Sequence, residues 1–227
     1  MSKRTVNILV PVIAVVLGLL AGAILMLVTG YNPVLGYDAL LEGVVGNSYN
    51  IGETIRQSAP LILAGLAVAF AFKTGLFNIG VEGQLIVGWF AAVWVGTSFD
   101  LPAIIHIPLA VLAAAAAGAF WAFIPGILKA KFRVHEVIVT IMLNYTALYL
   151  TNYLIYNVLT DNTDKTERIP ETATLRSDFL SGFTDYSRLH WGIVIALIGS
   201  ILMWFILEKT KRGFELRAVG FNEHASQ

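Results

Sequence analysis

The sequence predicts an all-α protein: a single polytopic transmembrane bundle, residues 1–227, of about six spans with a cytoplasmic N-terminus. Its 227 residues are 57% hydrophobic and only 13% charged, whereas soluble domains carry about 25% charged residues. A spanning helix needs about 20 apolar residues and satisfies its own backbone hydrogen bonds in lipid. Six intervals contain no Asp, Glu, Lys or Arg: residues 5–37, 57–72, 83–99, 101–128, 137–160 and 189–207.

The distribution of basic residues predicts the orientation, because Lys and Arg near span ends stay in the cytoplasm. Threading all six spans with the N-terminus inside places ten basic residues inside and five outside. The inner ten are Lys3, Arg4, Lys73, Lys129, Lys131, Arg133, Lys209, Lys211, Arg212 and Arg217, and the outer five are Arg56, Lys165, Arg168, Arg176 and Arg188.

The first interval, residues 5–37, has two interpretations. Lys3 and Arg4 precede an apolar run that contains small residues at 21–23, as in a secretory signal. Signal cores span only about 7–15 residues, and this run continues through residue 28. A retained helix is therefore favoured.

The third interval is preceded by a polar, glycine-rich stretch at residues 75–84, which holds Asn78, Glu82 and Gln84. Glu82 is the only acidic residue predicted to lie within a span, where an ionisable group is costly and marks a polar path or a structural hydrogen bond. The glycines favour a broken or re-entrant stretch. The alternative is that Glu82 and Gln84 sit at the cytoplasmic end of a helix and reach water.

The fourth interval carries small residues at every fourth position, which lets a neighbouring backbone approach closely and indicates a packing role. These residues are Ala110, Ala114, Gly118, Ala122 and Gly126.

The fifth interval carries amides and phenols at helical spacings. Such a face suits hydrogen bonding and stacking of a polar ring compound. An interfacial belt for the two outer tyrosines, with interhelical hydrogen bonds from the asparagines, is the alternative. The residues are Asn144, Tyr145, Tyr149, Asn152, Tyr153 and Tyr156.

Two polar segments flank the last interval. Residues 161–190 form a long outside loop of mixed charge, either a docking surface for an external partner or a solvated loop. Residues 208–227 form a cytoplasmic segment that suits a short helix against a soluble partner. A basic flank that stops transfer explains only its first residues.

Several chemistries are excluded by motif. The chain has no cysteine and no phosphate-binding loop, so ATP would have to be bound by another chain. His135 and Glu136 begin like a zinc-protease motif, but Val139 stands where the second histidine is required. The net charge of zero gives no basis for nucleic-acid binding. The lipid bilayer is the expected surrounding.

The stretch GLFNIGVEGQ at residues 75–84 resembles a signature of inner-membrane permeases of ABC importers for ribose-like sugars, branched-chain amino acids and nucleosides. RAVGFNEHA at residues 217–225 resembles the cytoplasmic coupling loop of that family. Residues 131–145 and IPET at 169–172 are similar to the sub-branch that works with nucleoside-binding lipoproteins.

The resemblance implies a permease subunit that imports nucleosides, or a related sugar-like solute, by alternating access. It implies no cofactor in this chain, since a separate ATP-binding cassette ATPase binds ATP. The other implied partners are a second permease subunit and an extracytoplasmic solute-binding lipoprotein. Members continue beyond the coupling loop, so the chain is expected to be the N-terminal part of a longer permease.

The expected site residues fall into two sets. The substrate pathway is predicted to involve Asn78, Glu82, Gln84, Asn144, Tyr145 and Tyr149. Coupling to the ATPase is predicted to involve Glu215, Arg217, Ala218, Gly220 and Asn222. The competing interpretation is an ion-coupled secondary transporter or channel, which Glu82 in a glycine-broken span would also suit. No residue constellation supports an intramembrane enzyme.

Overall fold

The structure, a computed structural model, describes residues 3–160 and 166–221, and within these ranges it is helical with no strand. Its long helices are α1 (Lys3–Val28), α2 (Pro33–Val45), α3 (Ser48–Lys73), α4 (Val81–Ser98), α5 (Ala103–Phe132), α6 (Glu136–Leu154), α8 (Gly192–Lys209) and α9 (Lys211–Phe221). Three short elements complete it: a π-helix η1 (Ile155–Leu159) that continues α6, a 3-10 turn η2 (Glu171–Ala173) and α7 (Asp178–Gly182).

Five helices of the described chain are long and apolar enough to cross a membrane, which confirms the all-α polytopic bundle. They comprise residues Leu9–Val28, Ser48–Lys73, Ala103–Phe132, Glu136–Leu159 and Gly192–Lys209. The number is five rather than the expected six, because the interval at residues 83–99 forms α4, which is not among them. This helix has 18 residues, carries Glu82 in its first turn and packs against both α5 and α6. Glu82 and Gln84, close to its start, leave this helix less apolar than the five spans.

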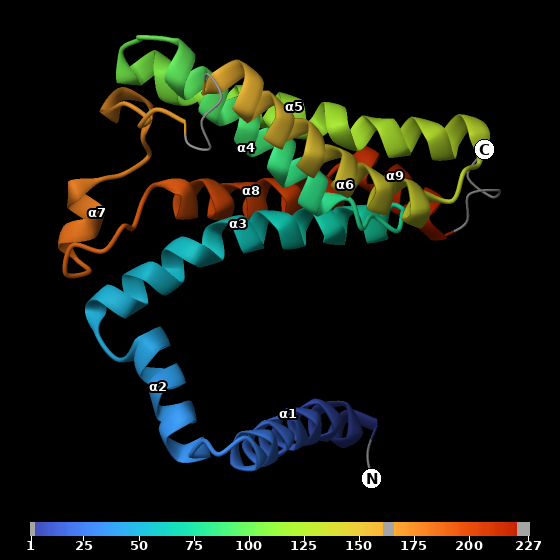
Figure 1. Ribbon diagram of the computed structural model, residues 1–227. Helices are drawn as coiled ribbons and strands as arrows, with labels where there is room; N and C mark the ends of the chain where they lie inside the picture. The colour runs from blue at the N-terminus through green and yellow to red at the C-terminus, as the bar shows by residue number, and fades with distance from the viewer. Residues whose placement is uncertain (1–2, 161–165, 222–227) are drawn as a thin grey trace.

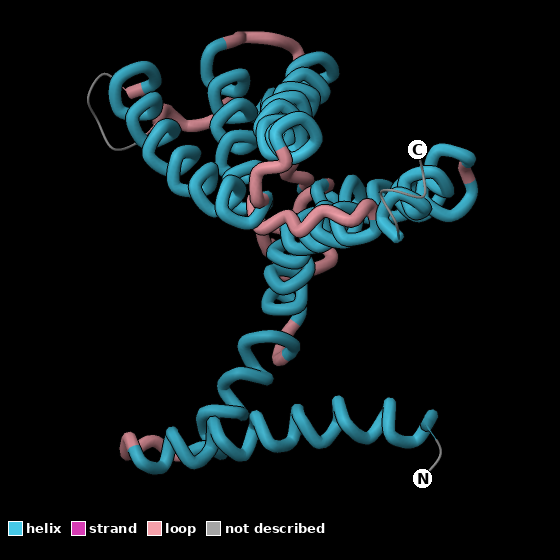
Figure 2. The backbone as a smooth tube through the Cα atoms, turned by 90° about the vertical axis from the view of Figure 1, so that its right-hand side faces the viewer, coloured by secondary structure: helices cyan, strands magenta, loops and turns pink. Residues whose placement is uncertain are grey.

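The interval at residues 5–37 forms two helices rather than one. The chain turns at Gly30, whose φ of +86° favours glycine, and α2 then begins after Asn32. The Asn32 side chain accepts a hydrogen bond from the Val34 N–H at 2.9 Å, and Pro33 occupies the first helical position. Much of α2 lies where an outside loop was expected. Figures 1 and 2 show α1 and α2 extending away from the other helices.

Helices α3 to α9 form the packed bundle, in which α4 lies against α5 and α6, and α3 lies against α8 (Figure 1). The row of small residues on α5 meets α4, as expected. A Cβ atom added at Gly88 would lie 3.0 Å from the Ala114 carbonyl oxygen, and one added at Gly118 would lie 3.3 Å from the Gln84 carbonyl oxygen. The two backbones therefore approach each other too closely for larger side chains.

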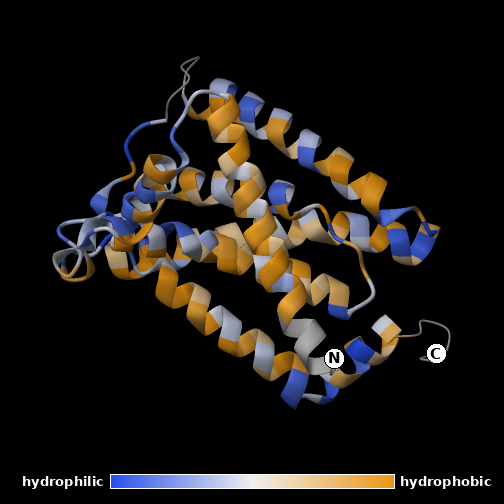
Figure 3. Ribbon diagram, turned by 90° about the horizontal axis from the view of Figure 1, so that it is seen from below, coloured by the Kyte–Doolittle hydropathy of each residue, from blue (hydrophilic) through white to orange (hydrophobic). Residues whose placement is uncertain are grey.

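The bundle has two ends, which Figure 1 separates by the positions of α7 and α9. The α7 end holds the start of α3 and residues 166–191. The α9 end holds the connection between α3 and α4, the break between α5 and α6, and α9 itself. Figure 3 shows apolar residues along the helices and hydrophilic residues gathered in the end connections.

Candidate functional site

The connection between α3 and α4 is held in place by asparagine side chains. The Asn78 Oδ1 accepts a hydrogen bond from the Gly80 N–H at 2.8 Å and lies 3.5 Å from the Gln84 Nε2. This local side-chain bond gives the Gly80 N–H, just before α4, an acceptor in place of a helical carbonyl oxygen. Asn78 and Gln84, both expected in the pathway, thus contact each other within this connection.

Asn144 fastens the same connection to α6. Its Oδ1 accepts from the Gly83 N–H at 2.9 Å, and its Nδ2 donates to the Ile79 carbonyl oxygen at 3.0 Å. Asn144 lies eight residues after the start of α6 at Glu136, which corresponds to about 12 Å along the helix. The first turn of α4 therefore begins well inside the bundle rather than at its end.

The side chains of three expected pathway residues lie on the outer side of the contact between α4 and α6. They are Glu82, Tyr145 and Tyr149. Helices α4 and α6 run parallel and meet at Gly83 and Asn144. Successive helical residues point about 100° apart, so Glu82, one residue before Gly83, and Tyr145, one residue after Asn144, turn to the same side of this contact. Glu82 is exposed, and Tyr145 and Tyr149 are 57% and 69% exposed.

Two neighbours extend this exposed surface by the same helical geometry. Trp89 on α4 is 56% exposed and Met142 on α6 is 59% exposed. We call the surface formed by Glu82, Trp89, Met142, Tyr145 and Tyr149 the Glu82 face. It joins one carboxylate and two phenols to apolar and aromatic side chains. Glu82 and Tyr145 lie at the depth of the first turn of α4, and Trp89 and Tyr149 lie further along their helices.

A cavity of about 370 Å³ lies on the inner side of the α3–α4 connection. Its polar lining comes from Thr74, Asn78, Gln84, Glu136 and Thr140, and Phe70, Phe77 and Met203 are among its apolar lining residues. The six expected pathway residues are therefore divided: two of them line this cavity, and three belong to the Glu82 face.

Lys129 and Glu136 join the break between α5 and α6 to the α3–α4 connection. The Lys129 Nζ lies 2.6 Å from the Glu136 Oε1 and donates to the Gly75 carbonyl oxygen at 3.3 Å. Sequence reasoning used Lys129 only as a marker of orientation. The two residues carry opposite charges and lie on either side of a short helix break, and this pattern in the sequence could have indicated the pair.

Helix α9 is fixed to α8 and reaches the α3–α4 connection. The Arg217 Nη1 lies 2.8 Å from the Glu208 Oε2, and Gly213 packs on the last turn of α8. Of the other residues expected in coupling, Glu215 is exposed and Ala218 and Gly220 are half-buried. Asn222 lies outside the described residues.

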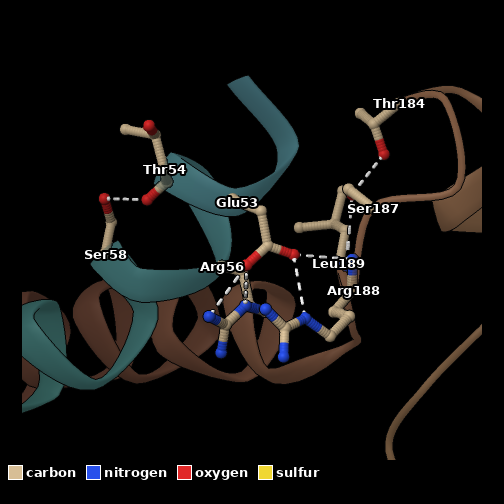
Figure 4. Close-up of polar contacts among 8 residues, drawn as sticks. All are labelled: Glu53, Thr54, Arg56, Ser58, Thr184, Ser187, Arg188 and Leu189. Atoms are coloured by element: carbon tan, nitrogen blue, oxygen red, sulfur yellow. Dashed lines mark hydrogen bonds and ion pairs between the residues drawn. The ribbon is translucent and has the colours of Figure 1, made fainter. Parts of the chain in front are cut away.

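The α7 end contains a polar cluster around Glu53 that the sequence did not indicate (Figure 4). The Glu53 Oε1 accepts from the Arg188 N–H at 2.8 Å and lies 3.6 Å from the Arg188 Nε, and its Oε2 lies 2.9 Å from the Arg56 Nη2. A side chain at Gly52 would collide with Ser187 and Thr184. Residues 184–188 are thereby held against α3, although they are more than 130 positions away in sequence.

The stretch at residues 169–172 is also held against the bundle. His106 is fully buried, and its Nδ1 and Nε2 lie 3.1 Å from the Thr172 Oγ1 and the Val95 carbonyl oxygen. A carbonyl oxygen only accepts, so Nε2 donates to Val95, and in the neutral imidazole Nδ1 accepts from the Thr172 hydroxyl. Residues 161–165 of the expected loop lie outside the described residues.

Within the described residues, no group of three or more His, Asp and Glu side chains is placed to hold a metal ion. The Glu82 face offers hydrogen bonding, stacking and one negative charge. The absence of a cofactor and of an ATP site remains a prediction.

Several known permeases are similar to this chain. It is 67% identical to the guanosine ABC transporter permease protein NupP of Bacillus subtilis (strain 168), covering 100% of this chain and 65% of the relative. It is 46% identical to the nucleoside ABC transporter permease protein NupB of Lactococcus lactis subsp. cremoris (strain MG1363), covering 100% and 64%. No solved structure matches the chain.

The chain thus spans less than two thirds of the length of these curated relatives. The family described as "Branched-chain amino acid transport system / permease component" matches residues 50–227. These residues include α3 except for its first two residues, α4 to α9, the α3–α4 connection and the Glu82 face. Together with its membrane-spanning helices, the match makes this a multi-pass cell-membrane protein, and the chain belongs to this permease family.

Proposed function

We propose that this chain forms part of the permease subunit of an ATP-binding cassette importer that moves nucleosides, or a related sugar-like solute, across the cell membrane. The observation that carries the proposal is the Glu82 face. The exposed Glu82 carboxylate lies about 12 Å along α6 from the start of that helix at Glu136. A charge at this depth would be costly against lipid, so this surface faces either water or another protein. The names of the two nucleoside and guanosine permease relatives support the substrate class.

The Glu82 face suits a nucleoside chemically. The Tyr145 and Tyr149 rings offer surfaces on which a base can stack, and the Glu82 carboxylate accepts hydrogen bonds from ribose hydroxyls or base N–H groups. Asn78, Gln84 and Asn144 support the path indirectly, because their bonds hold the first turn of α4 at this depth.

We further propose that the α9 end is cytoplasmic and the α7 end extracytoplasmic. The ATPase then docks on the segment at residues 208–227, with Glu215, Arg217, Ala218, Gly220 and Asn222 at or near the contact. A solute-binding lipoprotein docks on the loop at residues 161–190. A second permease subunit covers the Glu82 face and completes the path.

In this mechanism the chain needs no cofactor and performs no hydrolysis, because the partner ATPase binds ATP. ATP binding closes the ATPase, the docked segment moves, and the helices re-orient so that the path opens to alternate sides. The energy enters at α9 and the solute passes the Glu82 face.

The test is uptake of radiolabelled guanosine by proteoliposomes that hold the full-length permease pair, its ATPase and the binding protein. We expect uptake to require ATP and to persist when ionophores dissipate the ion gradients. Glu82→Gln should lower the uptake rate by about tenfold, the loss expected from one charged hydrogen bond. Glu42→Gln, which changes an exposed glutamate on α2, is the control and should be silent.

An ion-coupled secondary transporter is the second candidate, since the exposed Glu82 carboxylate could also carry a proton. That mechanism requires uptake to collapse with the ion gradient while ATP is intact. Gradient-dependent, ATP-independent uptake would overturn the importer proposal.

A further inference from the structure

We infer that a backbone contact between Gly220 of α9 and Gly75 of the α3–α4 connection transmits movement of α9 to the Glu82 face. The inference rests on the proposed function, because it assigns the route by which the ATPase acts on the path. It makes Gly75, Gly220 and Lys129 positioning residues.

The contact between the two glycines is close. A Cβ atom added at Gly75 would lie 3.1 Å from the Gly220 Cα, and one added at Gly220 would lie 3.0 Å from the Gly75 nitrogen and collide with the Lys73 carbonyl oxygen. Gly75 also has a φ of +75°, which other residues rarely adopt. Any side chain at either position therefore forces the two backbones apart.

A contact between backbones differs from one between side chains in what it transmits. Side chains can change rotamer and absorb a displacement. Two backbones in contact have no rotamers to change, so they either separate or move together. Gly213 packs closely on the last turn of α8, and α9 is one continuous helix from Lys211 to Phe221. A push on α9 therefore reaches Gly220, and through it Gly75, without being lost within the helix.

From Gly75 the connection continues in two directions. The Gly75 carbonyl oxygen accepts from the Lys129 Nζ, which pairs with Glu136 at the start of α6. Further along, Ile79 and Gly83 are bonded to Asn144. The backbone of the connection leads directly into α4, and the Lys129 and Asn144 side chains tie that connection to α6. Displacement of Gly75 therefore reaches the α4 side of the Glu82 face through the backbone and the α6 side through these hydrogen bonds.

The test uses the reconstituted full-length complex with Gly220→Ala, Gly75→Ala and the double variant. The measured quantity is guanosine transported per ATP hydrolysed. We expect each single variant to lower this ratio by about fivefold or more, the lower end of coupling between distant sites. The double variant should be no worse than the more affected single variant, because the two substitutions break one contact.

The control is Gly65→Ala on α3, where an added Cβ atom has no other atom within 4 Å. It should keep the wild-type ratio. Unchanged ratios in both single variants, or effects that multiply in the double variant, would overturn the inference. These outcomes differ from failure of the proposed function, in which the wild-type complex itself shows no ATP-dependent uptake.

A second measurement does not need transport. These 227 residues contain no cysteine, so Phe77→Cys, at a position 45% exposed in the native chain, adds one labelling site for an environment-sensitive fluorophore, and the complex without this substitution, labelled in the same way, gives the background. ATP binding should change its emission in the otherwise unaltered complex. Gly220→Ala should remove most of that change, and an undiminished response would contradict transmission through Gly75.

Discussion

The two ends of the bundle are joined by different kinds of contact. At the α9 end, backbones touch directly at Gly75 and Gly220. At the α7 end, residues 169–188 are held by side chains, through the Glu53 cluster and through His106 bonded to Thr172. Backbone contacts transmit displacement, whereas hydrogen-bonded side chains can exchange partners. The comparison indicates a rigid linkage at the end proposed to meet the ATPase and a releasable fastening at the end proposed to meet the binding protein.

The solvent exposure of the Glu53–Arg188 pair also favours a contact that can open. The Glu53 carboxylate is only 13% exposed, but its partner Arg188 is 60% exposed. An ion pair with one exposed member contributes little by itself, so most of the fastening comes from the Arg188 backbone N–H. Such a contact can open locally while the helices stay packed.

The largest expected effect concerns the rigid end. Asn144→Ala leaves the Gly83 N–H and the Ile79 carbonyl without their partner, at about 1–3 kcal/mol for each unsatisfied group. We expect the unfolding temperature in detergent to fall by about 5–10 °C. Asn157→Ala, which removes only a bond to the nearby Tyr153 carbonyl, should change it by much less. Equal shifts would show that α4 is not held by Asn144.

The second effect concerns the releasable end. Glu53→Leu removes the acceptor for Arg188 and Arg56, so residues 176–188 should open more often. Loss of a charged hydrogen bond costs about 1.5–3 kcal/mol, which corresponds to trypsin cleavage at Arg188 about tenfold faster or more. The unfolding temperature should change less than in Asn144→Ala. A large loss of global stability would instead make this end as rigid as the other.

The smallest effect is a pH dependence of the α7 end. Burial, reinforced by the charge of Arg56, lowers the pKa of His190 from its ordinary 6.5, against an opposing effect of Glu53. The unfolded segment takes up a proton near pH 6.5, whereas the folded segment does so only at lower pH. The contribution of His190 to stability is therefore complete above about pH 6.5 and is lost as the pH falls from there through the lowered pKa.

Protonation would also remove the acceptor for the Gly192 N–H, which donates to the His190 Nδ1 at 3.0 Å. Amide hydrogen exchange around residues 188–192 should, after correction for intrinsic rates, be less protected at pH 5 than at pH 7.5. In His190→Gln that dependence should disappear. A matching loss of protection at residues 75–83 would remove the distinction between the ends.

Local composition was sufficient to identify the main elements. The charge-free intervals matched long helices, and the small residues of α5 meet a neighbouring backbone. Asn78, Gln84 and Asn144 were predicted to line the substrate pathway, and that role stays a prediction. The structure shows their hydrogen-bond partners within the bundle, which for Asn144 is the alternative that the sequence also left open. The turn at Gly30 that creates α2 was missed, although Gly30, Asn32 and Pro33 are typical of a turn followed by a helix start. The Glu53 cluster was missed because its members are far apart in sequence.

By itself, the sequence determined that this protein is a helical membrane bundle and which short stretches carry its polar groups. Hydropathy is a property of residues in succession, and a helix satisfies its backbone within its own segment. Only the tertiary structure decided that Glu82, Tyr145 and Tyr149 share one exposed face, and that Gly75 meets Gly220. Those relations depend on how helices pack at a particular depth and rotation, and many packings are compatible with the same pattern of apolar residues.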